Sequence, residues 1–470
     1  KLVGGLDDVR DAGLSALFAA EAASARLAAQ FDLAADFGEA AWSIHQRLAS
    51  PDPGDRFAVV REACLAAAHR RQPETARERC LQMIAVAANA PDLADAYGQS
   101  VRAMRLAGRE ADAWNFCREG LARFGIHLPG RISRSRLLLA MMAWRLIGRT
   151  PRRLIPHNAR TEQAAHSFAD AVAYDVWQHS PRHAVYLAVR MVTRARLRGY
   201  DSALFQSIDA LINAVLKDYR AAAAAGDRAL AGLSHLPAGR GTTIQRAVVF
   251  GRMWRDPQAR AIESAGQVYD YSVAEGDLVV AATGALFETM LIWRSAPTLE
   301  QVAAKLEDTG SKAARLGDAR VRAEIASLAE LVRRLRLPEP LPSHLPDELI
   351  HVKNDVPSLA AVEYLSLVGN WLAILHIVDA FRGRRPMADF HPNSVIWRFY
   401  KTLARLKAGL PFDRADLKLI ELAARENPAD HRGKLLLLQA EHDRGKGGGD
   451  SLLAYRRALE AMQQGSSRLE

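Results

Sequence analysis

The sequence predicts an all-α fold in which helical hairpins stack side by side as an α-solenoid, a right-handed superhelix. A helical pattern recurs three times near the start of the chain, at residues 36–42, 72–77 and 108–114. Taking Ala41, Ala76 and Ala113 as equivalent positions gives steps of 35 and 37 residues. No alternating apolar pattern of useful length is present, so we expect no β-sheet.

A period of about 34 residues is typical of tetratricopeptide-type helix pairs. In such repeats a small residue lets two helices approach closely, and each pair buries its apolar face on the next. We therefore expect the repeated alanines on the contact face between helices. Stacked helix pairs generally present surfaces to partners and seldom enclose a reaction chamber.

Composition favours an elongated or divided molecule. The chain has 470 residues, of which 49% are hydrophobic and 25% charged, which is long for one compact domain. Cys64, Cys80 and Cys117 lack zinc-ligand spacing, and we expect them inside the repeat stack. No uninterrupted apolar run reaches the length of a membrane span, so we expect a cytoplasmic protein. Because the chain opens without Met, we also expect a piece of a longer protein.

Breaker residues divide the chain into four parts. Residues 1–130 form the clearest repeats, punctuated by prolines and glycines at hairpin turns, and residues 131–335 form a central helical block. An Arg-rich helix is expected at 133–147. Residues 336–357 carry too many prolines for a helix and predict a connector. Residues 358–470 are expected to be helical repeats that end in a hairpin of helices 430–445 and 450–463.

The basic residues are mostly arginine. Net charge is +10, and 10 of the 63 basic residues are lysine, which leaves 53 arginines. An excess of Arg and Ala is typical of a GC-rich bacterial genome, although basicity also suits nucleic acid or anionic surfaces. The densest cluster comprises Arg131, Arg134, Arg136, Arg145, Arg149, Arg152, Arg153 and Arg160. The cluster is either a solvated or internally paired face, or a phosphate-binding surface in which Arg145, Arg149, Arg152 and Arg153 are the candidate interaction residues.

Several segments of the chain are similar to segments of one protein family. Residues 108–129, with Gly108-Arg109-Glu110-Ala111 near the start and Leu128-Pro129 at the end, are similar to the family segment GRYEEALALGLEALRLLGVPLP. Residues 218–230 and 275–281 resemble the family's GDYRAG and GDLVYA segments. Residues 426–458 resemble NPENFLHKYLLLEAELAR and the helix after it. In these segments the chain resembles the large bacterial signalling ATPases. The order of the segments is that family's order, and together they extend over nearly the whole chain.

The resemblance implies the tetratricopeptide-like helical region that lies between an AAA-type ATPase module and output domains such as a histidine kinase or nucleotide cyclase. The sequence contains no phosphate-binding loop of the Gly-x-x-x-x-Gly-Lys-Ser/Thr type and no kinase or cyclase motif. We therefore predict a non-catalytic regulatory or scaffold region that binds a protein or small effector and relays its presence to attached domains. No catalytic residue, cofactor or metal is expected.

Two other functions are considered. The chain is alternatively a stand-alone repeat adaptor or transcriptional regulator that contacts nucleic acid through the basic cluster. The third reading is an all-α enzyme of the terpene-synthase type, because residues 7–11 spell Asp-Asp-x-x-Asp. Residues 354–358 with Glu363 approach the second metal motif of that class, but they place the Glu one residue late and insert a proline.

Two further residue sets have a structural and a functional interpretation. His179 and His183 stand four apart, as in a helical metal site, but Pro181 between them favours a helix boundary. The tryptophans occur about once per helix pair, and we expect most of them in the core and a few as groove anchors. They are Trp42, Trp114, Trp144, Trp177, Trp254, Trp293, Trp371 and Trp397.

Overall fold

The computed structural model describes residues 2–28, 30–48, 53–147, 158–199, 202–236, 239–275, 277–316, 319–336, 355–380, 391–446 and 451–465. Every regular element in these ranges is a helix and none is a strand, which confirms the all-α prediction. The chain divides into two compact units, residues 1–201 and 202–470. The predicted block boundaries at 130 and 335 stay predictions, and most of the predicted connector, residues 337–354, lies outside the described ranges.

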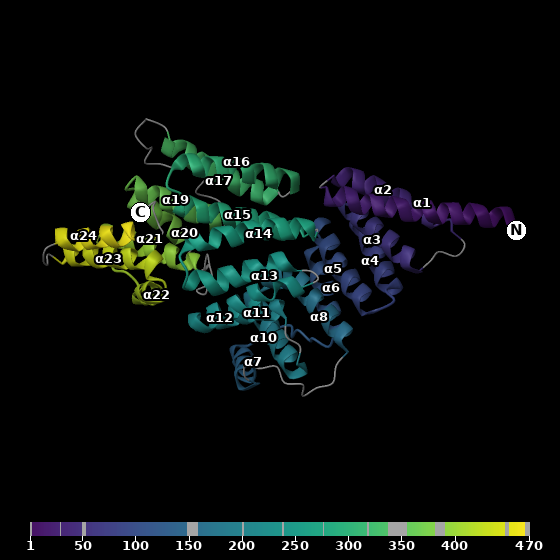
Figure 1. Ribbon diagram of the computed structural model, residues 1–470, viewed down its shortest axis with the longest axis horizontal. Helices are drawn as coiled ribbons and strands as arrows, with labels where there is room; N and C mark the ends of the chain where they lie inside the picture. Colours follow the sequence, from purple (N-terminus) through teal and green to yellow (C-terminus); the bar gives the residue numbers. More distant parts are fainter. Residues whose placement is uncertain are drawn as a thin grey trace. The chain divides into compact units, whose positions relative to one another are not determined.

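Unit 1 is a succession of helices. They are α1 (Leu2–Leu27), α2 (Phe31–His45), α3 (Pro53–His69), α4 (Pro73–Val86), α5 (Ala90–Leu106), α6 (Glu110–Arg123), α7 (Arg134–Ile147), α8 (Ala159–Ala171), α9 (Ala173–His179) and α10 (Pro181–Arg198). Helices α1 to α5 each lie beside the next helix of the chain, whereas α7 packs on α10 and α8 on α5 (Figure 1). The Arg-rich helix predicted at 133–147 is confirmed as α7.

Unit 2, taken by itself, begins with α11 (Ala203–Val215), α12 (Tyr219–Ala231), α13 (Arg240–Arg246), α14 (Gln258–Ala274), α15 (Leu278–Ser295), α16 (Leu299–Leu316) and α17 (Ala319–Arg336). It ends with α19 (Asp355–Leu367), α20 (Trp371–Ala380), α21 (Asn393–Lys407), α22 (Arg414–Glu426), α23 (Pro428–Gly445) and α24 (Ser451–Gln463). The last two confirm the predicted closing hairpin. Between α13 and α14 the chain forms one π-helical turn, Ala247–Gly251, and a short 3-10 helix, Arg252–Trp254.

One type of turn recurs between helices. The residue two positions before the next helix adopts a left-handed conformation at Arg71, Gly108, Lys217 and Gly369, with φ between 55° and 74°. The N–H of the following residue then bonds to the carbonyl five residues back, as from Arg109 to Met104 at 2.7 Å. This is the Schellman arrangement, which satisfies carbonyls at the end of the first helix and turns the chain into the second.

Small residues line the helix contacts of unit 1, as predicted. Ala41, Ala76 and Ala113 are all buried. The three cysteines are also buried and free, so their predicted burial is confirmed. Cys64 of α3 and Cys80 of α4 lie in contact, with 3.3 Å between their sulfur atoms.

Ion pairs in unit 1 repeat the sequence period. Glu62 of α3 pairs with Arg26 of α1 at 3.1 Å, and Arg61 of α3 pairs with Asp95 of α5 at 3.4 Å. These residues stand 36 and 34 apart in the sequence. The first helix of each hairpin is therefore joined to the first helix of the next one by an arginine and an acid that stand one repeat apart.

Aromatic side chains fill much of the unit 2 core. Trp254 stacks on Tyr219 with ring centroids 3.9 Å apart, and both are buried. Nearby, a Cβ on Gly226 would lie 2.8 Å from the carbonyl oxygen of Ala247, so only glycine lets α12 approach the π-helical turn this closely.

The expected core position is confirmed for four tryptophans, Trp144, Trp254, Trp293 and Trp397. Trp42, Trp114 and Trp371 are half-buried, and the side chain of Trp177 lies outside the described part. Among the described residues, none of the helices combines the length and apolar character that crossing a bilayer requires.

Candidate functional site

A shallow groove of about 440 Å³ runs between α16 and α17 of unit 2. Its floor is apolar and comes from both helices; it is made by Ala303, Leu306, Ala329 and Val332. Leu306 and Val332 are buried, whereas Ala329 is exposed at the edge. The groove exists because two alanines stand where larger side chains would close the space between the helices.

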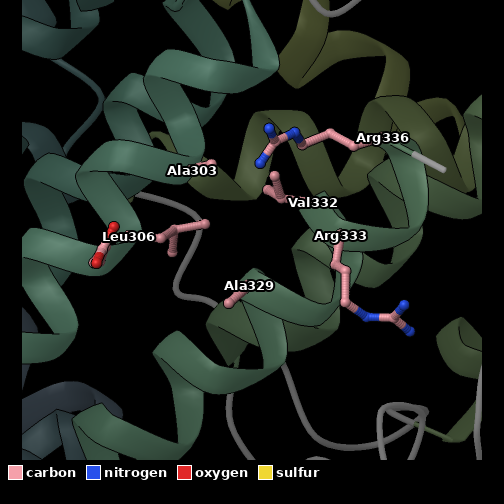
Figure 2. Close-up of a pocket in the computed structure, with 7 residues that line it drawn as sticks. Ala303, Leu306, Ala329, Val332, Arg333 and Arg336 are labelled. Carbon is pink, nitrogen blue, oxygen red and sulfur yellow. The ribbon is translucent and has the colours of Figure 1, made fainter.

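Charged side chains line the rim of this groove. Arg333 donates two hydrogen bonds to Glu330, at 2.7 and 2.8 Å, and the bonds from Arg333 and Arg334 lower the pKa of Glu330 to about 2. The guanidinium of Arg336 lies 3.7 Å from Glu300. Figure 2 shows Arg336 reaching towards the space between the helices, while Arg333 points away from it. Arg336 thus gives the mouth of the groove a positive edge.

The chemistry of the lining suits binding. Glu307 is the one carboxylate among the lining residues, and no nucleophile or histidine accompanies it. A nucleophilic site typically pairs its nucleophile with an adjacent base within hydrogen-bond reach. An apolar floor with Arg336 at its edge instead fits an apolar side chain or chain segment that carries a negative charge beside it.

The structure places Arg145 of the predicted interaction residues on α7, where it is exposed. Arg149, Arg152 and Arg153 lie outside the described residues, so their proximity to Arg145 stays a prediction. The described remainder of the basic cluster is exposed as well and comprises Arg131, Arg134, Arg136 and Arg160.

Other arginines have a structural role instead. Glu162 of α8 accepts hydrogen bonds from Nε and Nη2 of Arg194 of α10, at 2.9 and 2.7 Å. In α4, Arg79 is buried and donates to Glu39 and to the carbonyl oxygen of Ala63. Arginines such as these stabilise helix contacts, and they account for part of the Arg excess without any external anion.

A buried polar cluster links three helices of unit 2, α15, α19 and α21, and sequence analysis missed it. Glu363 accepts hydrogen bonds from the indole of Trp293 at 2.7 Å and from Nε of Arg294 at 2.8 Å. Arg294 also donates to Asn393 at 2.7 Å. Glu363, considered above as part of a metal motif, is thus engaged in the core. No local pattern marks these residues, because their partners stand 69 to 99 positions away.

The His179 and His183 pair marks a helix boundary, as the sequence predicts. Helix α9 ends at His179 and α10 begins at Pro181. The ring of His179 stacks on Trp114 at 3.8 Å, and Nε2 of His183 lies 2.9 Å from the carbonyl oxygen of Pro129. Within the described ranges no three His, Cys, Asp or Glu side chains are grouped as metal ligands.

Comparisons of the chain with protein-family models, with curated proteins and with solved structures found no match. The functional conclusion therefore rests on the packing of the helices and on the chemistry of the surfaces described above.

Proposed function

We propose that this chain is the tetratricopeptide-like regulatory and scaffold region of a bacterial multidomain signal-transduction ATPase. In this role it is non-catalytic. It binds a protein segment or small effector and relays occupancy to the attached ATPase and output domains. The observation that carries the proposal is the apolar, arginine-edged groove between α16 and α17, which offers a binding surface but no catalytic pair.

The repeat geometry of unit 1 supports the solenoid part of the proposal. Helix α1 contacts α3, and α3 contacts α5, so equivalent helices of successive hairpins pack together. The ion pairs of Arg26 with Glu62 and of Arg61 with Asp95 follow the same order. A stack whose members contact mainly their neighbours changes curvature at small cost, so a ligand that prefers one curvature shifts the population towards it.

The test is isothermal titration of the purified chain with an AAA-type ATPase module of the predicted family. Ala329 lines the groove, so Ala329→Trp should fill it and reduce the affinity about tenfold or more, as for loss of a central apolar contact. Ala323→Trp is the matched control, because Ala323 is also exposed on α17 but does not line the groove. No heat with the unsubstituted chain, or equal affinity for both variants, would contradict the proposal.

The two other functions stay predictions. Nucleic-acid binding would draw on the exposed arginines of the basic cluster, yet α7 presents large apolar side chains among them, which a phosphate backbone does not recognise. The enzyme reading would need a cavity lined by acidic side chains, whereas the groove of unit 2 holds the single carboxylate of Glu307.

A further inference from the structure

Helix α7 carries an apolar face that no described helix covers. The helix packs on α10 through the buried side of Trp144. Its opposite side exposes four large apolar residues, Leu138, Leu139, Met142 and Leu146, at 59%, 65%, 58% and 79% of their full accessible area. At 100° per residue these four lie within an arc of about 100°, so they form one continuous strip along the helix.

Positive charge borders the strip on both sides. On the helical wheel Arg134 and Arg145 lie at one edge of the strip and Arg136 at the other. All three are exposed, and none takes part in an ion pair within the described part of the chain. The surrounding sequence contains nine arginines and no acidic residue between Glu119 and Glu162. The helix therefore lies in a strongly cationic segment that contains no acidic residue of its own.

The shape of this surface distinguishes among possible occupants. A protein partner would have to offer an apolar groove for the strip and acidic side chains along both of its edges. Nucleic acid would use the arginines but gain nothing from four exposed leucine and methionine side chains. An anionic lipid surface uses both features, since the apolar strip enters the boundary between headgroups and acyl chains while the flanking arginines meet lipid phosphates.

We propose that α7 is a membrane-contacting helix that lays its Leu138, Leu139, Met142 and Leu146 face into an anionic lipid surface. The helix lies parallel to the membrane surface and does not cross the bilayer. Because the strip is short, binding depends on both the apolar insertion and the arginines, so it is reversible and weakens as salt screens the charge. This interaction lies beyond the proposed regulatory function and does not depend on it.

Vesicle co-sedimentation of the full chain tests the proposal. We expect binding to vesicles of equal parts phosphatidylglycerol and phosphatidylcholine, and little binding to phosphatidylcholine alone. The triple variant Leu139→Gln, Met142→Gln and Leu146→Gln should lose about tenfold or more in affinity, because it removes most of the inserted apolar area. The variant Arg134→Gln with Arg145→Gln should weaken binding and reduce its dependence on salt.

The matched control carries Leu372→Gln, Leu452→Gln and Leu453→Gln, which remove three exposed leucines of unit 2. It should bind as the unsubstituted chain does. All substituted residues are exposed, and circular dichroism establishes that each variant is folded. Equal binding to neutral and anionic vesicles, absence of binding to either, or unchanged binding by the α7 triple variant would overturn the proposal.

A site-specific readout establishes which helix meets the lipid. The native cysteines are buried, so Leu146→Cys provides one accessible thiol for an environment-sensitive dye. Its emission should shift to the blue when anionic vesicles are added, and emission from a dye on Leu372→Cys should not. If nucleic acid or a protein shifts the Leu146 dye while anionic vesicles leave it unchanged, the lipid assignment is wrong.

Discussion

Glu162 illustrates how single residues hold unit 1 together. Its carboxylate is buried, accepts the two-pronged hydrogen bond of Arg194 and also pairs with Arg198. Separating such a buried pair by removing one partner typically costs about 3–5 kcal/mol, because the remaining charge has lost both water and its partner. Arginine is well suited to this role, since its planar fork satisfies both carboxylate oxygens at once.

Buried histidines make the free energy of unfolding depend on pH. Burial lowers the pKa of His166 to about 3, and the nearby positive charge of Arg194 acts in the same direction. Burial, Lys434 and Arg294 likewise lower the pKa of His431 to about 3. Between pH 3 and 6.5 the unfolded chain therefore binds more protons than the folded one. The contribution of these histidines to the free energy of unfolding is fully present above pH 6.5 and falls as the pH decreases below that value.

We predict that each of these histidines removes about 1.4 kcal/mol from the free energy of unfolding per pH unit below 6.5. Urea unfolding measured at pH 7 and at pH 5.5 checks this. His166→Gln should make the loss between the two values smaller by about 1 kcal/mol. The control is His127→Gln at an exposed position. An unchanged pH dependence in His166→Gln would show that His166 is protonated in the folded protein.

At the scale of elements, the left-handed turn sets how one helix leads into the next. Gly108 and Gly369 occupy the position with glycine, whereas Arg71 and Lys217 occupy it with a residue that has a Cβ. The same backbone geometry thus arises from two kinds of sequence. A glycine before a helix is a recognisable turn signal, but an arginine or lysine there gives none, which limits what the sequence can predict about these turns.

Two glycines of the same hairpin allow a clean test of this turn. A Cβ would meet no atom within 4 Å at either Gly98 or Gly108, but Gly108 has a φ of +74° and Gly98 lies inside α5. Gly108→Ala should lower the free energy of unfolding by about 1 kcal/mol, because alanine is strained in that conformation. Gly98→Ala should raise it by about 0.5–1 kcal/mol. Urea denaturation measures both changes, and the same sign for both would refute the explanation.

The sequence predicted where helices begin and end better than it predicted which of their side chains are buried. Proline marked the hairpin turn where α4 begins at Pro73, because proline acts locally. The helix predicted at 430–445 begins at Pro428. Which side chains are buried depends on segments that are distant in the sequence. The sequence predicts the Arg-rich helix at 133–147 but does not predict that Leu139 and Leu146 are exposed, because their exposure depends on which distant segments pack on that side of α7.

For the molecule as a whole, each unit has its own hydrophobic core. Tyr97 and Phe168 belong to the main core of unit 1, whereas Trp293 and Phe399 belong to that of unit 2. A unit with its own core has the means to fold by itself. The groove of unit 2 was not predictable from sequence, because it depends on the sizes of Ala303 and Ala329 facing each other from two helices.

We predict that residues 1–201 and 202–470 fold when expressed separately. All three cysteines lie in unit 1 and are buried, so a thiol reagent reports the unfolding of that unit alone. The urea midpoint for thiol exposure should agree between the full chain and the 1–201 fragment. A fragment without native circular dichroism, or a midpoint that differs clearly between the two, would contradict this.

The ion pairs that span one repeat have a consequence for how such a chain changes in length. Removal of one complete hairpin would bring Arg26 into register with Asp95, so an arginine would again face an acid. Loss of a single residue within a hairpin would instead rotate every later side chain of that helix by about 100° and separate the partners. Descendants of this chain should therefore gain or lose whole hairpins more readily than single residues.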